Sequence, residues 1–202
     1  MKRLLAGALF ALLLLAGLGF GAWRLGYLRF GPPVATEVSP EAAAQAEAKY
    51  RELVEHGRPV RLNEVELTSA LRYRLRDRLP GDLFDPTVAL RGDTVTLSGR
   101  VPADRLPPVP ALDRVRAFLP DTANIDVTGA LAGGSGNAYF EVREVRFAGV
   151  PIPARYFPQA LRGLGRRDAP GLPATALGFR LPEGVGAARV AGGELILEPG
   201  TR

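Results

Sequence analysis

The sequence opens on an apolar segment that constrains where the rest of the chain can lie. Residues 4–22 contain no charged side chain, and four consecutive leucines form the centre of this segment. As a helix it would be about 30 Å long, which matches the hydrocarbon core of a bilayer. Lys2 and Arg3 precede it. This length and apolarity predict a membrane-spanning helix over residues 4–23, within an anchor formed by residues 1–30.

The residues after this segment are typical of a membrane interface. Trp23, Arg24 and Tyr27 follow it directly, and aromatic and basic side chains favour the headgroup region of a bilayer. We therefore expect these three residues to lie at the interface. Basic charge is equal on the two sides of the segment, so charge alone does not orient it. The short N-terminus favours a signal-anchor, with the bulk of the chain outside the cytoplasm.

Two other interpretations of the apolar segment stay open. A cleaved signal peptide also begins with basic residues, and cleavage would leave a secreted or periplasmic protein. Its apolar core is usually about 7–15 residues long, however, and the triplets at 17–19 and 19–21 match a cleavage site only weakly. A helix buried in a soluble protein normally has a polar face, which this segment lacks. We favour the retained single-pass anchor.

Composition argues against several kinds of catalytic site. The chain has no cysteine and one histidine, His56, so disulfides, thiol nucleophiles, an acylated cysteine and most histidine-based metal sites are excluded. The serines lie outside any G-x-S-x-G pattern, and the acidic residues show no spacing typical of metal ligands. We therefore expect a protein that is not an enzyme, with no catalytic residues, no metal site and no cofactor.

The charge pattern gives a weaker indication of partners. The net charge is +5, but the arginines are spread among acidic residues, as in residues 72–78, rather than gathered in a basic stripe with aromatic residues. This distribution argues against nucleic-acid binding. A solvated basic surface and attraction to acidic lipid headgroups remain the two interpretations.

Residues 31–57 are expected to form a linker followed by an Ala-rich stalk or lid helix. Ser39 is a suitable N-cap, Pro40 suits the first helical position, and Gly57 provides the end. The predicted helix covers residues 41–56. Its apolar face is thin, so we expect it to pack loosely. That face consists of Ala43, Ala46, Tyr50, Leu53 and Val54.

The remaining residues, 58–202, are expected to form one α+β domain that begins with a well-marked helix. Asn63 can cap this helix and Glu66 can complete a capping box. Leucines then recur at every fourth position, which predicts one apolar stripe that continues until Pro80. The stripe consists of Leu67, Leu71, Leu75 and Leu79.

Three β-hairpins are predicted after this helix. The first joins residues 87–91 to 93–101 around Gly92, and the last joins 186–190 to 194–198 across two glycines. Short helices are expected over residues 111–119 and 156–164, and a loop over 166–178.

The middle hairpin is predicted to contain a β-bulge. It joins residues 125–131 to 138–149 across a glycine-rich turn. The apolar alternation of its second strand changes phase, which indicates an extra residue near Arg143 or Glu144.

These elements resemble the bacterial tubular-lipid-binding (TULIP-like) domains, in particular the LmeA-like phospholipid-binding family. The resemblance rests on ELTSAL at 66–71, DTVTLSGRV at 93–101, LPDT at 119–122 and AGVPIP at 148–153, and it covers roughly residues 60–198. It implies a bent antiparallel sheet wrapped around a helix, a half-barrel whose apolar groove holds lipid chains.

The resemblance implies a membrane-anchored protein that binds or handles lipid, with membrane lipid and envelope proteins as candidate partners. Burying a lipid chain is favourable by about 0.8 kcal/mol per CH₂ group. The same aliphatic side chains would equally suit a solid core, and a structural or scaffolding component of the cell envelope is therefore the alternative. The groove candidates are Leu67, Leu71, Leu75, Val88, Leu90, Val95, Leu97, Phe140 and Val142.

Overall fold

The structure is a computed structural model that describes residues 37–78, 83–102, 121–158 and 172–200. The predicted anchor, its interface residues Trp23, Arg24 and Tyr27, and the predicted helix over 111–119 lie outside these ranges. Most of the predicted helix over 156–164 does as well. No helix in the described ranges is long and apolar enough to cross a membrane.

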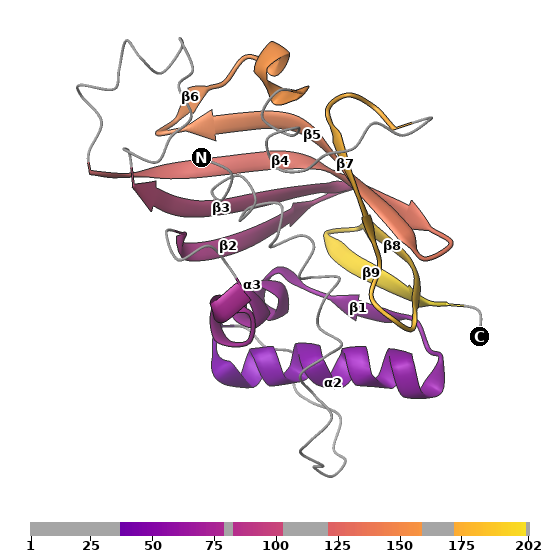
Figure 1. Cartoon of the computed structure of the whole chain (residues 1–202). Helices are drawn as coiled ribbons and strands as arrows, with labels where there is room; N and C mark the ends of the chain where they lie inside the picture. Colours follow the sequence, from indigo (N-terminus) through magenta and orange to yellow (C-terminus); the bar gives the residue numbers. More distant parts are fainter. Residues whose placement is uncertain (1–36, 79–82, 103–120, 159–171, 201–202) are drawn as a thin grey trace.

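Two antiparallel sheets, two α-helices and two short 3₁₀ turns make up the regular structure of the described part of the chain (Figure 1). The larger sheet has the order β2 (Phe84–Arg91), β3 (Thr94–Pro102), β4 (Thr122–Gly134), β5 (Asn137–Phe147) and β6 (Val150–Pro151), and β7 (Ala176–Arg180) also pairs with β5. The smaller sheet has the order β1 (Val60–Leu62), β9 (Glu194–Pro199) and β8 (Val185–Ala191). The predicted α+β class with a mostly antiparallel sheet is confirmed, and the described strands form no closed barrel.

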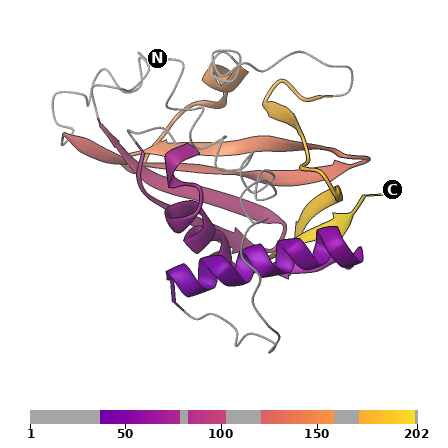
Figure 2. The same cartoon turned by 60° about the horizontal axis from the view of Figure 1, so that its bottom comes forward.

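Helix α2 (Pro40–His56) has the predicted ends but not the predicted packing. The Ser39 side chain accepts a hydrogen bond from the Ala42 N–H at 3.1 Å, and Gly57 ends the helix in the left-handed conformation with φ of 64°. The expectation of loose packing is wrong, because one face of α2 lies against α3 and β1 (Figure 2). The small alanine side chains let the backbones approach closely. The buried residues are Ala42, Ala43, Ala46, Tyr50 and Leu53.

Helix α3 (Glu64–Tyr73) begins as predicted and ends early. Asn63 and Glu66 form the expected capping box, with hydrogen bonds of 2.9 and 3.0 Å. The N–H groups of Arg74 and Leu75 both donate to the Ala70 carbonyl. This shared acceptor ends the α-helix at Tyr73, and a 3₁₀ turn, η1 (Arg76–Arg78), follows. The predicted continuation of one helix to Leu79 is therefore wrong.

The three predicted hairpins are confirmed. Their turns lie at residues 92–93, 135–136 and 192–193. The central residues of the last two turns have positive φ, which matches the right-handed twist of the paired strands.

The predicted β-bulge is also confirmed. The register between β4 and β5 shifts between Thr128 and Gly129, which leaves Arg143 as the extra residue on β5. The apolar residues on both sides of the bulge are therefore buried together: Ala138, Phe140, Val142, Val145 and Phe147.

Three strands were not predicted from the sequence: β1, β6 and β7. β6 has two residues and lies where the chain was expected to leave the preceding strand. β1 has three residues, too few for a readable alternation, and it forms by pairing with β9. β7 lies at the end of the predicted loop over 166–178 and pairs with β5. β1 and β7 are both defined by a partner strand distant in sequence. Together with the helices, the strands enclose one hydrophobic cluster that draws on both sheets.

Candidate functional site

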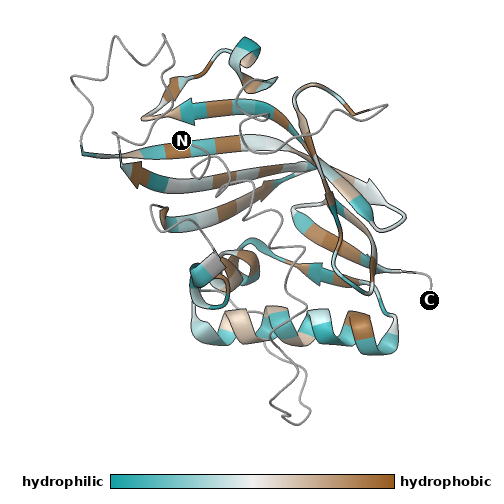
Figure 3. Ribbon diagram, viewed as in Figure 1, coloured by the Kyte–Doolittle hydropathy of each residue, from teal (hydrophilic) through white to brown (hydrophobic). Residues whose placement is uncertain are grey.

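The nine groove candidates lie together in the core. They come from α3, from Leu75 just after its end, and from β2, β3 and β5, and all belong to one hydrophobic cluster. Their exposed fractions range from 0% to 5%. In Figure 3 hydrophobic and hydrophilic residues alternate along the strands, as expected when one face of a sheet packs on a core. The structure thus brings the candidates into contact, and in it they are buried rather than open to solvent.

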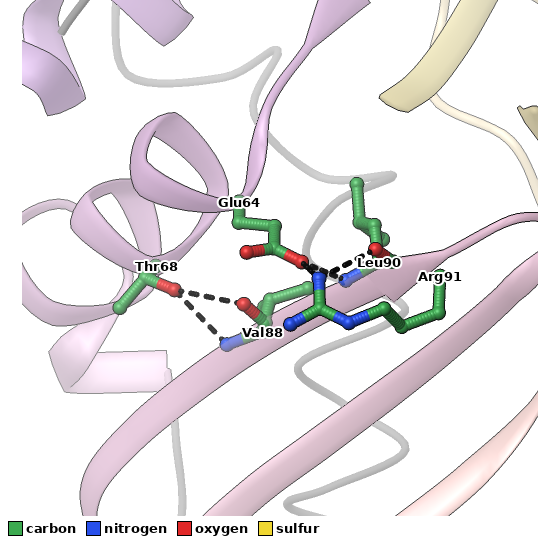
Figure 4. A network of polar contacts seen from close by, with 5 residues as sticks. All are labelled: Glu64, Thr68, Val88, Leu90 and Arg91. Carbon is green, nitrogen blue, oxygen red and sulfur yellow. Dashed lines mark hydrogen bonds and ion pairs between the residues drawn. The ribbon is translucent and has the colours of Figure 1, made fainter. Parts of the chain in front are cut away.

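Helix α3 binds the outer edge of β2 through side chains (Figure 4). The Glu64 carboxylate accepts hydrogen bonds from the Leu90 N–H at 2.5 Å and from the Arg91 guanidinium at 2.7 Å. The Thr68 hydroxyl accepts from the Val88 N–H at 2.9 Å and lies 3.4 Å from the Val88 carbonyl oxygen. These bonds occupy polar backbone groups of β2 that have no strand beside them.

A third contact extends this series to the end of the helix. The Arg72 Nε donates to the Pro86 carbonyl at 2.9 Å. Every fourth residue of the helix thus meets every second residue of the strand. Four helical residues rise about 6 Å and two strand residues about 6.6 Å, so the two repeats coincide. Helix α3 therefore takes the place of a neighbouring strand and covers this edge. The signal in the sequence is a polar stripe, Glu64, Thr68 and Arg72, beside the leucine stripe.

A cleft of about 660 Å³ opens where this series ends, between the end of α3, η1, the start of β2 and Arg100 on β3. Its charged lining residues are three arginines and two aspartates: Arg72, Arg76, Asp77, Asp85 and Arg100. Its apolar lining residues are Leu71, Tyr73, Leu83, Phe84 and Pro86. Of the groove candidates, Leu71 alone is among the described residues that line this cleft.

Two aromatic side chains are unusually accessible at this cleft. Tyr73 is 46% exposed and Phe84 is 43% exposed. A small cavity of about 10 Å³ shares Leu71, Leu83 and Pro86 with the cleft and reaches Leu97. The apolar wall of the cleft is therefore continuous with the core.

A β-bulge in β2 shapes the wall of the cleft that carries Asp85 and Arg100. Phe84 pairs with Arg100 and Thr87 pairs with Ser98, so one extra residue lies on β2 between these pairs. Asp85 adopts φ of 48° there, a left-handed conformation that aspartate tolerates better than most residues. Its carboxylate forms an ion pair with Arg100. Pro86 is suited to a bulge because it has no N–H to pair.

The arginines of the cleft are held to different degrees. Arg72 is fixed by its bond to the Pro86 carbonyl, and Arg100 is paired with Asp85. Arg76 is exposed, and within the described ranges it has no hydrogen-bond or ion-pair partner. Sequence reasoning did not single out these three residues, because Arg100 joins the other two only through the pairing of β2 with β3.

No group of three or more His, Cys, Asp or Glu residues in the described ranges is placed to hold a metal ion. The described part of the chain thus combines an α+β fold, in which the sheet is mostly antiparallel, with a cleft lined by arginines and aromatic residues. Neither a family model, nor a curated protein, nor a solved structure matches the chain.

Proposed function

We propose that the protein is a membrane-anchored, extracytoplasmic lipid-binding protein and that it does not act as an enzyme. The observation that supports this proposal is the cleft, where the exposed Tyr73 and Phe84 lie beside apolar residues that continue into the core. Exposed aromatic side chains in a concave site favour an apolar or amphiphilic ligand. The volume of the cleft lies within the range of about 300–1,000 Å³ that is usual for ligand sites.

The proposed fold relationship is to the TULIP-like half-barrels, in particular the LmeA-like family. The packing of α3 along one edge of the larger sheet, with its leucines in the core, supports this relationship. An acyl chain would lie over Leu71, Leu83 and Pro86, on the apolar wall of the cleft. Each buried CH₂ group would contribute about 0.8 kcal/mol.

The anchor would hold this cleft near its ligand. In this proposal residues 4–23 span the membrane, with Trp23, Arg24 and Tyr27 at its interface. Membrane lipid is then the main partner, and other envelope proteins are further candidates.

The alternative is a structural or scaffolding component of the cell envelope with a solid core. The observation that favours it is the burial of the nine groove candidates, whose exposed fractions do not exceed 5%. In this alternative the cleft is a surface depression with no lipid ligand.

Photo-crosslinking of the full chain distinguishes the two functions. The chain is placed in phosphatidylcholine nanodiscs that contain a phospholipid with a diazirine on its acyl chain, and crosslinked peptides are mapped by mass spectrometry. Lipid binding predicts crosslinks to the peptides that carry residues 71–77 and 83–86. Crosslinks confined to residues 1–30 would contradict lipid binding and favour the structural role.

A matched pair of variants sharpens this test. Tyr73→Ser removes an exposed aromatic from the cleft, and Tyr139→Ser removes an exposed aromatic that lies on β5 and is 37% exposed. Lipid binding in the cleft predicts that Tyr73→Ser lowers the crosslink yield several-fold and that Tyr139→Ser leaves it unchanged. An equal loss in both variants would show that the cleft is not the binding site.

A further inference from the structure

We propose that the cleft recognises an oxyanion, such as the phosphate of a lipid headgroup, through Arg72, Arg76 and Arg100. This inference rests on the proposed function and adds the chemical class of the ligand. Guanidinium groups suit phosphate because their planar N–H donors can bind two oxygens at once. The apolar wall beside them would hold the rest of an amphiphile.

The first arginine is fixed before any ligand binds. The Arg72 Nε donates to the Pro86 carbonyl at 2.9 Å, and the side chain is half-buried against β2. A side chain that is already held loses less rotational freedom when a ligand binds. Because Nε already donates to the Pro86 carbonyl, the two terminal nitrogens of the Arg72 guanidinium are its remaining donors.

The second arginine is oriented by the bulge. Arg100 pairs with Asp85, whose left-handed backbone lies directly after Phe84. Both side chains are about half exposed, at 52% and 59%. An ion pair with this exposure contributes little to folding stability. The strained bulge therefore places a cation at the cleft without a corresponding gain in stability.

The third arginine, like the first, has no carboxylate partner among the described residues. Arg76 lies on η1 and, within the described ranges, has no ion-pair partner. The described lining of the cleft holds three guanidinium groups and two carboxylates, Asp77 and Asp85. The described lining thus carries one positive charge in excess, which an oxyanion would balance. Tyr73 and Phe84 on the same lining favour an oxyanion that carries an apolar group over a free inorganic ion.

The test measures binding of four ligands to the full chain in a neutral maltoside detergent, by thermophoresis. Dihexanoyl phosphatidic acid carries both parts, dihexanoylglycerol carries the apolar part, and glycerol 3-phosphate and inorganic phosphate carry the anion. We expect the phosphatidic acid to bind most tightly. Arg76→Gln should weaken its binding about fivefold, the effect of removing one partly exposed charge contact, and should leave dihexanoylglycerol binding unchanged.

A surface arginine serves as the control. Arg58→Gln removes the same charge at a residue that is 72% exposed and paired with Glu52, and that does not line the cleft. We expect it to bind all four ligands as the unaltered chain does. Equal weakening by both substitutions would overturn the inference, since the effect would then come from net charge.

The four ligands separate failure of the inference from failure of the proposed function. Equal binding of dihexanoylglycerol and phosphatidic acid would overturn the oxyanion inference and leave lipid binding intact. Tight binding of glycerol 3-phosphate without any gain from acyl chains would support the oxyanion site and overturn lipid binding. Inorganic phosphate that competes as well as phosphatidic acid would identify a free-anion site. Binding of none of the four would overturn both.

Discussion

Tyr50 connects α2 to the opposite end of the chain. Its hydroxyl donates to the Glu183 carbonyl at 2.9 Å, and the ring is 4% exposed. Burial, and then the negative charge of Glu183, raise the pKa of Tyr50 above its usual value of 10.0. The folded state therefore favours the neutral phenol. The contribution of Tyr50 to the free energy of unfolding is present in full below the pKa that this tyrosine has in the unfolded chain. It is lost as the pH rises through the higher folded pKa.

Tyr50→Phe should make the free energy of unfolding less dependent on pH above about pH 10. At pH 8 the variant should be less stable by about 1 kcal/mol, because the hydrogen bond is lost. Urea unfolding of both proteins at pH 8 and pH 10.5 measures the difference. If the difference in free energy of unfolding between the two proteins is the same at pH 8 and pH 10.5, the raised pKa of Tyr50 does not contribute to alkaline unfolding.

Gly129 is the residue opposite the β-bulge of β5. A Cβ atom at this position would lie 2.2 Å from the Glu141 carbonyl oxygen and 2.6 Å from the Phe140 ring. We predict that Gly129→Ala destabilises the fold by about 3 kcal/mol or more, since the backbone must move. Gly134→Ala is the control, because a Cβ there meets nothing within 4 Å. Thermal unfolding of both variants checks this prediction, and similar melting temperatures would contradict it.

At the scale of elements, the series of side-chain bonds between α3 and β2 gives a third prediction. Thr68→Val keeps the shape of the side chain but removes the hydroxyl that accepts from the Val88 N–H. The buried amide would then lack a partner, at a cost of about 1–3 kcal/mol. Hydrogen exchange at Val88 should also become faster.

Thr94→Val is the control for this substitution. Its hydroxyl bonds to the exposed Asp93 carboxylate, so we expect a change within about 0.5 kcal/mol. If both variants unfold at the same denaturant concentration, the Thr68 bond does not stabilise the edge of β2.

The packing of α2 gives a fourth prediction. The helix contributes Ala46, Tyr50 and Leu53 to the core, and its Lys49 forms a 2.6 Å ion pair with Glu66, which is 1% exposed. A fragment that begins at residue 58 would lose this ion pair and would expose to water the core side chains that α2 covers, which is strongly destabilising.

Residues 37–202 should therefore unfold cooperatively, and residues 58–202 should not. Circular dichroism and amide proton dispersion of the two fragments measure this. A folded 58–202 fragment with an unchanged midpoint would restore the interpretation of α2 as a loosely packed stalk.

At the scale of the whole molecule, the sequence predicts local features better than distant ones. The capping box at Asn63 and the bulge at Arg143 depend on neighbouring residues, and both were predicted. The end of α3 at Tyr73 was missed, because leucine spacing continues through a change of helix type. β1 and β7 were missed because each requires a partner strand from another part of the chain.

The candidate site was predicted less well than the fold. The nine aliphatic residues do cluster, but the residues of a core and of a groove have the same composition, so their burial could not be read from the sequence. The arginines of the cleft come together through the pairing of Phe84 with Arg100 and the bond between Arg72 and Pro86. Neither contact leaves a pattern in the sequence.

The covered edge of β2 has a consequence for neighbouring copies of the chain. At high local concentration, which the proposed anchor would produce, an open strand edge would recruit a strand from the next copy. Along β2 the amides of Val88 and Leu90 are already engaged by α3. On the far side of the same sheet, the edge is formed by the two-residue β6 and by β7, which both pair with β5. A neighbouring copy would therefore find no free row of amides along β2 to which it could add a strand.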